Sequence, residues 1–140
     1  MREYTNTITK EVIEPFTVSQ LTNVQDFEMM RGDKLVFSVI AQDDEEEAID
    51  LTDFDIVMTV KESIDDLDED ALFRKTLGDG VEKLEAENGK FKVTILTPDT
   101  NLAIAGVYIY DIQMSNGVDA YTIMTGKFVI NPDVTQLFAV

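Results

Sequence analysis

The sequence predicts an all-β fold, an antiparallel β-sandwich of about seven strands, on three observations. Two long alternating runs, 106–115 and 121–130, meet at Asn116–Gly117. This dipeptide between alternating strands is the strongest short-range signal for a hairpin, because a type I′ turn needs positive φ at both central residues. Turn signals recur at the roughly 8–12-residue spacing typical of a sandwich. Long helical periodicity is absent.

The first third of the chain predicts an edge element followed by two strands. Residues 1–23 contain β-branched residues around Pro15, which favours an edge strand or an extended arm over a central strand. A short strand is expected at 24–30. The tripeptide Arg31–Gly32–Asp33 is interpreted as the turn after it, and the nearly all-apolar segment 35–41 as the next strand.

The middle of the chain alternates between strands and turns. Two acidic segments, 43–50 and 62–70, are expected to be solvated loops. The glycine-containing segments 78–80 and 88–89 predict tight turns. The strands expected between these segments lie at 54–61, 72–77, 81–85 and 91–95.

The inward faces of these strands predict the core. In the first half the expected core residues are Leu35, Phe37, Val39, Phe54, Ile56, Met58 and Val60. In the second half they are Phe91, Val93, Ile95, Tyr108, Tyr110, Ile112, Met114, Met124, Phe128 and Ile130.

A short helical turn is expected over 101–104, after Pro98 stops the preceding strand, and with Gly106 and Tyr108 behind it this turn indicates the type of sandwich. In immunoglobulin-like domains a tyrosine near the start of the penultimate strand donates a hydrogen bond to the backbone upstream. Tyr108 is the candidate for this role, and a half-buried tyrosine without such a bond is the alternative. The chain has no cysteine and no tryptophan, so an antibody-type domain is excluded.

Composition restricts the function classes. The 140 residues are expected to form one domain with a core of its own. The absence of cysteine and histidine removes thiolate chemistry, the commonest general base and the commonest transition-metal ligands. A net charge of −17 disfavours nucleic acid and anionic membrane surfaces as partners. We expect a soluble chain, because no segment has the length of a membrane span or the apolar core of a signal peptide.

The sequence contains only weak motifs for metal binding or catalysis. Asp66, Asp68 and Asp70 have the spacing that opens an EF-hand loop, but Ala71 and Leu77 stand where glycine and glutamate are required. A solvated loop is therefore favoured over a loose Ca²⁺ or Mg²⁺ site. No serine has a histidine to activate it, and no carboxylate pair stands out. The sequence predicts no enzyme, no metal and no cofactor.

Several segments together resemble a known family. They include Asp50–Leu51–Thr52 before one strand, the segments 96–100 and 106–112, and the closing segments 126–130 and 133–135. Over roughly residues 24–135 the chain is similar to the immunoglobulin-like domain of structural proteins of tailed bacteriophages, notably the N-terminal domain of baseplate upper proteins. The unusual acidity of both loops, and Asp53 where such domains often have glycine, depart from that pattern.

The resemblance implies a non-enzymatic virion protein of the baseplate, tail or head, assembled in the host cytoplasm in several copies and bound to other virion proteins. We expect an immunoglobulin-like β-sandwich at 24–135, an N-terminal arm or edge strand at 1–23 and an apolar tail at 136–140. The partner interface is predicted at Tyr4, Ile8, Val12, Phe16, Leu137, Phe138 and Val140. A carbohydrate-binding module for host attachment and an acidic DNA mimic are the alternatives.

Overall fold

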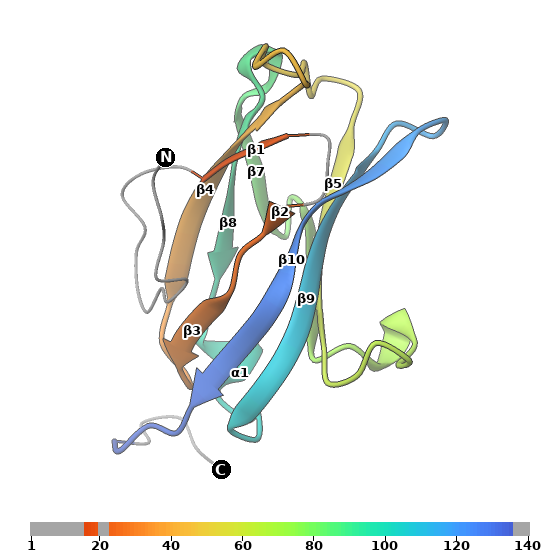
Figure 1. The fold of residues 1–140 in the computed structure, drawn as a ribbon. Helices are drawn as coiled ribbons and strands as arrows, with labels where there is room; N and C mark the ends of the chain where they lie inside the picture. The colour runs from red at the N-terminus through yellow and green to blue at the C-terminus, as the bar shows by residue number, and fades with distance from the viewer. Residues whose placement is uncertain (1–15, 20–22, 136–140) are drawn as a thin grey trace.

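The computed structural model describes residues 16–19 and 23–135, which form an all-β fold (Figure 1). Three single helical turns, η1 (Asp68–Asp70), η2 (Ala86–Asn88) and α1 (Thr97–Thr100), lie between the strands. The strands of the described part are β1 (Phe16–Ser19), β2 (Asn23–Val24), β3 (Phe27–Met30), β4 (Leu35–Gln42), β5 (Asp55–Lys61), β6 (Phe73–Leu77), β7 (Gly80–Glu85), β8 (Lys90–Ile95), β9 (Gly106–Ser115) and β10 (Ala120–Asn131).

The strands form two layers that are joined along one side. One layer has the order β1-β4-β8-β7, and the other has β6-β5-β9-β10, with β2 and β3 both paired to β10. Strands β6 and β7 share two residue pairs and connect the layers into a nearly closed sheet. The all-β prediction is confirmed, but the described strands are ten and mixed in direction rather than seven and antiparallel. The parallel pairs are β1 with β4, β6 with β7, and both β2 and β3 with β10.

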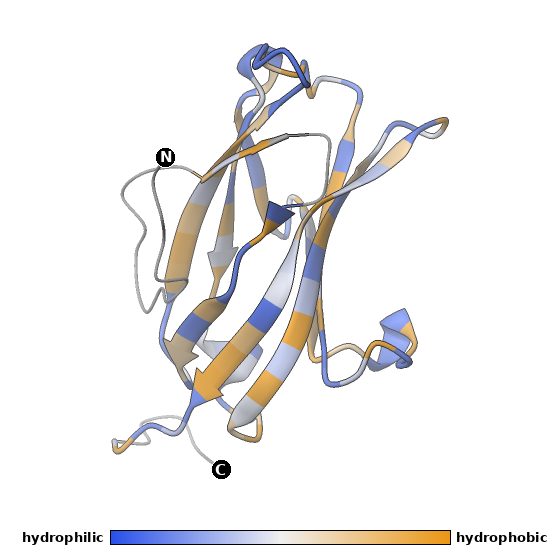
Figure 2. Cartoon of the chain, in the orientation of Figure 1, coloured by the Kyte–Doolittle hydropathy of each residue, from blue (hydrophilic) through white to orange (hydrophobic). Residues whose placement is uncertain are grey.

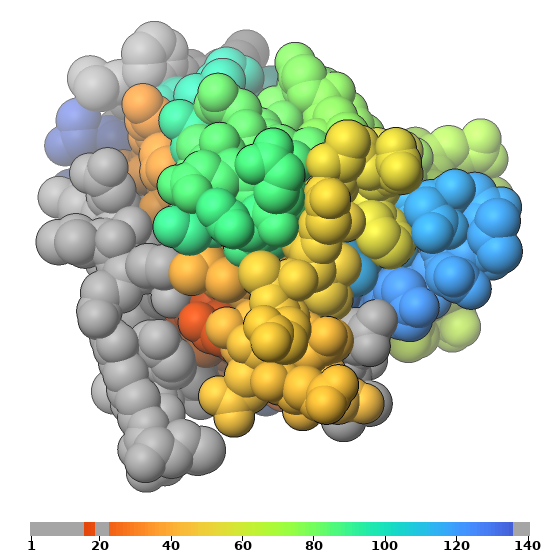
Figure 3. Space-filling model, turned by 90° about the horizontal axis from the view of Figure 1, so that it is seen from above, coloured from red at the N-terminus to blue at the C-terminus, as the bar shows by residue number. Residues whose placement is uncertain are grey.

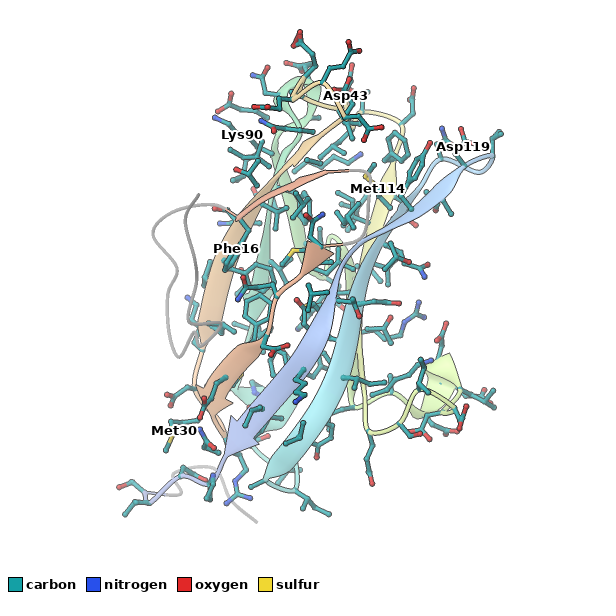
Figure 4. The ribbon with its side chains drawn as sticks, in the orientation of Figure 1. Phe16, Met30, Asp43, Lys90, Met114 and Asp119 are labelled. Atoms are coloured by element: carbon teal, nitrogen blue, oxygen red, sulfur yellow. The ribbon has the colours of Figure 1, made fainter. Side chains whose placement is uncertain are left out.

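The core lies between the layers. Every expected core residue is buried except Phe54, which is only partly buried and packs its ring against Tyr121. The alternation of apolar and polar residues along β9 and β10 is visible in Figure 2. The sequence-based core omitted Phe16 and Phe27, whose rings meet edge to face at 5.7 Å. Phe16, labelled in Figure 4, also contacts Phe37 on the neighbouring strand β4, whereas its contact with Phe27 on β3 crosses between the layers.

The hairpin between β9 and β10 is confirmed, but its turn differs from the expected type. Ser115 pairs with Ala120, so the loop has four residues, 116–119. Within it only Gly117 has positive φ, whereas type I′ requires two such residues. The side-chain oxygen of Asn116 accepts hydrogen bonds from the backbone N–H groups of Val118 and Asp119, which stabilises the wider loop. Further along, a register shift directs both Ile123 and Met124 inward and interrupts the expected alternation.

Tyr108 makes the backbone hydrogen bond that the sequence analysis proposed for it. Its hydroxyl donates to the Ile104 carbonyl oxygen at 2.6 Å. This bond ties the start of β9 to the segment after α1. Burial and the negative charge of Glu62 raise the pKa of the Tyr108 hydroxyl, so it stays protonated and able to donate at neutral pH.

A buried ion pair connects β6 to α1. Lys75 on β6 is an inward-pointing charge, and its Nζ lies 2.6 Å from Asp99 Oδ2. The same carboxylate oxygen accepts a hydrogen bond from the Leu96 N–H at 2.7 Å, which caps the helical turn.

The segment 1–23, predicted to be an arm or an edge strand, contains β1, which lies at the edge of its layer. Strand β1 pairs with β4 and contributes Phe16 and Val18 to the core. Residues 1–15 and 20–22 of this segment, and the predicted tail 136–140, lie outside the described residues.

Candidate functional site

A groove of about 570 Å³ lies on the outer face of the layer formed by β6, β5, β9 and β10. We call it the outer-face groove. It exists because the strands alternate: their inward residues fill the core, and the intervening residues face the groove. Its lining residues are Val24, Asp26, Val57, Thr59, Lys61, Ile64, Asp68, Arg74, Ile109, Tyr110, Asp111, Gln113, Ser115, Thr125, Gly126 and Lys127.

A row of paired residues crosses the floor of the groove. Strand register places Arg74 beside Thr59, Thr59 beside Asp111, Asp111 beside Thr125, and Thr125 beside Val24. The row therefore runs from β6 to β2 with Asp111 at its centre.

The adjacent row brings two lysines to either side of an apolar residue. Ile109 on β9 pairs with Lys61 on one side and Lys127 on the other. The floor thus combines positive, negative and apolar side chains within neighbouring rows.

The segment between β5 and β6 forms one wall of the groove. Lys61 fixes this wall, because its Nζ donates to the Asp66 carbonyl oxygen at 2.9 Å and lies 2.8 Å from Asp68 Oδ1. The hydrogen bond and charge of Lys61 lower the pKa of Asp68, so this carboxylate stays ionised at neutral pH. Ile64 in the same wall is 80% exposed.

The opposite wall is formed where the chain passes from β2 to β3. The Lys127 N–H donates to Asp26 Oδ1 at 2.8 Å, and the Tyr110 hydroxyl donates to the Gln25 carbonyl oxygen. Gly126 allows this close approach, because a Cβ at that position would lie 2.5 Å from the Gln25 oxygen. Val24, which is 75% exposed, stands at the rim.

Asp111 is a half-buried carboxylate at the centre of the groove floor. The hydrogen bond that it accepts from Gln113 Nε2 is long, at 3.5 Å. Burial raises its pKa, while the charges of Lys61 and Arg74 partly oppose the shift. Both cations are engaged with the wall, since Lys61 pairs with Asp68 and Arg74 Nη2 lies 3.9 Å from it.

One predicted interface residue, Phe16, lies in the described part of the chain, and it does not line the groove. Phe16 is 3% exposed and belongs to the core of this chain, so its side chain is not on the described surface. The other predicted interface residues, Tyr4, Ile8, Val12, Leu137, Phe138 and Val140, lie outside the described residues. Their role as an interface stays a prediction.

The two acidic loops lie at different places. The loop 43–50 projects at one end of the molecule, where Figure 3 shows it beside the turn that contains η2. There Asp43 Oδ1 accepts hydrogen bonds from the backbone N–H groups of Glu45 and Glu47. The second loop forms the groove wall. Among the described residues, no group of acidic side chains converges in a way that would hold a metal ion.

Sequence reasoning did not find the groove, although it recognised the outward faces of the strands. The mixed character of the face with Ile109, Asp111 and Gln113 was the available signal. Only the strand order shows that this face lies beside the outward residues of β5 and β10.

The fold and the groove define a class: an all-β, two-layer domain with a mixed-charge recess on one sheet face. No known family model and no curated protein matches the chain. Among solved structures it is loosely similar to the N-terminal domain of phage TP901-1 ORF48, with 12% identity over 89% of this chain and 96% of that one and a TM-score of 0.46. No helix in the described part of the chain is long and apolar enough to cross a membrane.

Proposed function

We propose that this chain is a non-enzymatic structural protein of a tailed-phage virion, which uses an immunoglobulin-like sandwich to mediate protein–protein assembly. The observation that carries the assembly role is the outer-face groove. It places exposed apolar side chains around a half-buried carboxylate that accepts only a long hydrogen bond within the described chain. A surface of this kind gains contacts when a partner covers it.

The strand order supports the immunoglobulin-like assignment. Such domains place strands A, B, E and D in one sheet and C, F and G in the other. Here β1, β4, β8 and β7 have the order of the first sheet, and β5, β9 and β10 that of the second. The Tyr108 hydrogen bond adds support, because it has the form of a tyrosine corner. The parallel pairing of β1 with β4 and the additional β6 are departures from the simple seven-strand plan.

The virion assignment is supported by the sequence resemblance to structural proteins of tailed phages. Its proposed partners are other virion proteins and further copies of the chain. Sugar binding receives no comparable support, because no described aromatic side chain is exposed enough to form a stacking platform.

The test of the virion role is the protein composition of purified particles. Particles from a phage that encodes this chain should contain it at a fixed copy number after density-gradient purification, as measured by quantitative mass spectrometry. If the chain remains in the cell lysate and is absent from particles, the virion assignment is wrong.

The assembly state is tested by light scattering on two forms of the chain, full length and 16–140. Truncation at residue 15 retains Phe16 and Val18, whereas truncation at 23 would remove them from the core. A defined oligomer that becomes a monomer in the 16–140 form would support assembly through the N-terminal segment. A monomer in both forms would exclude self-assembly by that segment.

A further inference from the structure

We infer that the outer-face groove binds an extended segment of a partner protein that presents Lys or Arg to Asp111 and apolar side chains beside it. This inference rests on the assembly role proposed above. It adds which surface of this chain binds the partner and which side chains the partner presents there.

The first argument is the state of Asp111. Its neighbours in the row have their hydroxyl groups engaged elsewhere: Thr59 Oγ1 accepts from Arg74 Nε at 3.3 Å, and Thr125 Oγ1 donates to the Tyr110 carbonyl oxygen at 2.9 Å. The nearby cations hold the wall through Asp68. The half-buried carboxylate therefore has room for a further donor. A cationic donor gives the stronger, charge-assisted bond.

The second argument is the distribution of apolar surface. Val24 and Ile64 stand exposed on opposite walls of the groove, and Ile109 lies on the floor one row from Asp111. A ligand that satisfied only the carboxylate would leave these side chains in water. An occupant with apolar residues flanking its cation would cover them as well.

The third argument is charge. The wall between β5 and β6 carries Glu62, Asp65, Asp66, Glu69 and Asp70 in addition to Asp68, and the chain as a whole has a net charge of −17. This field attracts a basic segment and accelerates its encounter with the groove. It also opposes a second copy of this chain as the occupant, because two copies repel each other.

The fourth argument is shape. The two walls stand at opposite ends of the cross-strand row, so the groove runs along the strands. From 109 to 115 the floor extends about 20 Å at the usual rise of a strand. An extended segment of about seven residues fits this length, with alternate side chains directed at the floor.

The probe is the blocked heptapeptide Thr-Val-Thr-Lys-Thr-Val-Thr, titrated into the full chain and followed by NMR of the backbone amides. We expect saturable shifts at residues 57–61, 109–113 and 125–127, with millimolar affinity. The same peptide with Glu in place of Lys should cause no shifts at these positions. A peptide with Ser in place of both Val residues should bind at least threefold more weakly.

Matched variants separate the groove from general charge attraction. Asp111→Asn should weaken binding of the Lys peptide at least threefold. Asp53→Asn changes the net charge equally at an exposed position outside the groove and should leave the affinity unchanged.

Three results would overturn the inference: no saturable shift, equal affinity for the Lys and Glu peptides, or equal affinity in the Asp111→Asn and wild-type chains. Shifts of the groove residues with protein concentration alone would assign the groove to a second copy instead. The particle-composition experiment does not depend on the groove, so the two proposals can fail separately.

Discussion

The carboxylate of Asp111 is desolvated in the groove without a short hydrogen bond in return. Burial disfavours the charged form, so the folded chain holds a proton on Asp111 more tightly than the unfolded chain does. The stability contributed by this group therefore falls as pH rises from the ordinary Asp pKa, 3.8, to its raised value. Above that range Asp111 is charged, and the free-energy cost of burying its carboxylate is fully present.

Asp111→Asn should accordingly be more stable than wild type at pH 7, by a few tenths of a kcal/mol once solvent screening is allowed for. The advantage should shrink as the pH falls through the raised pKa of Asp111 toward 3.8, because wild-type Asp111 then becomes protonated. Urea unfolding of both chains at pH 3.5, 5 and 7 measures this trend. If the difference in the free energy of unfolding between the two chains were constant with pH, burial of the charged Asp111 carboxylate would not be its cause.

Tyr108 links two parts of the fold through one hydrogen bond. Tyr108→Phe removes the donor and leaves the Ile104 carbonyl without it, so we expect a loss of about 1 kcal/mol in the free energy of unfolding. The measurement is urea denaturation. Tyr121→Phe is the matched control, because that ring is only partly buried. Equal stability of the two variants would show that the bond contributes nothing.

At the scale of elements, the passage from β2 to β3 depends on Gly126. The Gln25 N–H donates to the Thr125 carbonyl oxygen at 2.9 Å, and the Gln25 carbonyl accepts from Tyr110, so the crossing backbone is held on both sides. The backbone at Gln25 therefore cannot move away easily from a methyl group added at position 126.

Gly126→Ala should therefore destabilise the fold by about 1–3 kcal/mol, the usual cost of forced overpacking. Gly106→Ala is the control, because no atom lies within 4 Å of its added Cβ, and we expect a change within about 0.5 kcal/mol. Thermal unfolding of the two variants makes the comparison. If Gly126→Ala matched the control, the crossing backbone would have to be more adaptable than its hydrogen bonds imply.

At the scale of the whole molecule, the net charge of −17 opposes folding through self-repulsion. Added salt screens this repulsion over a Debye length of about 10 Å at 0.1 M. Added salt also weakens the exposed ion pairs, but such pairs contribute little to the free energy of unfolding.

The melting temperature at pH 7 should rise when KCl is increased from 20 to 500 mM. Circular dichroism melts measure this effect, and K₂SO₄ at equal ionic strength separates screening from effects of the individual ion. A fall in the melting temperature would mean that ion pairs such as Lys61 with Asp68 outweigh the repulsion.

The sequence by itself determined the all-β class, the long closing hairpin and the burial of every expected core residue except Phe54. It could do so because the residues of a strand's inward face recur at every second position. Tyr108 was also identifiable, since its partner Ile104 is only four residues away. These features are local, and local patterns report them.

The tertiary structure alone decided which faces became neighbours. The Phe16 ring meets Phe27 and Phe37 because β1 pairs with β4, and nothing near Phe16 in the chain encodes that pairing. The outer-face groove arises in the same way, because Thr59, Asp111 and Thr125 become adjacent only when three distant strands align. Contacts between segments far apart in the chain depend on strand order and register, which the spacing of single residues does not contain.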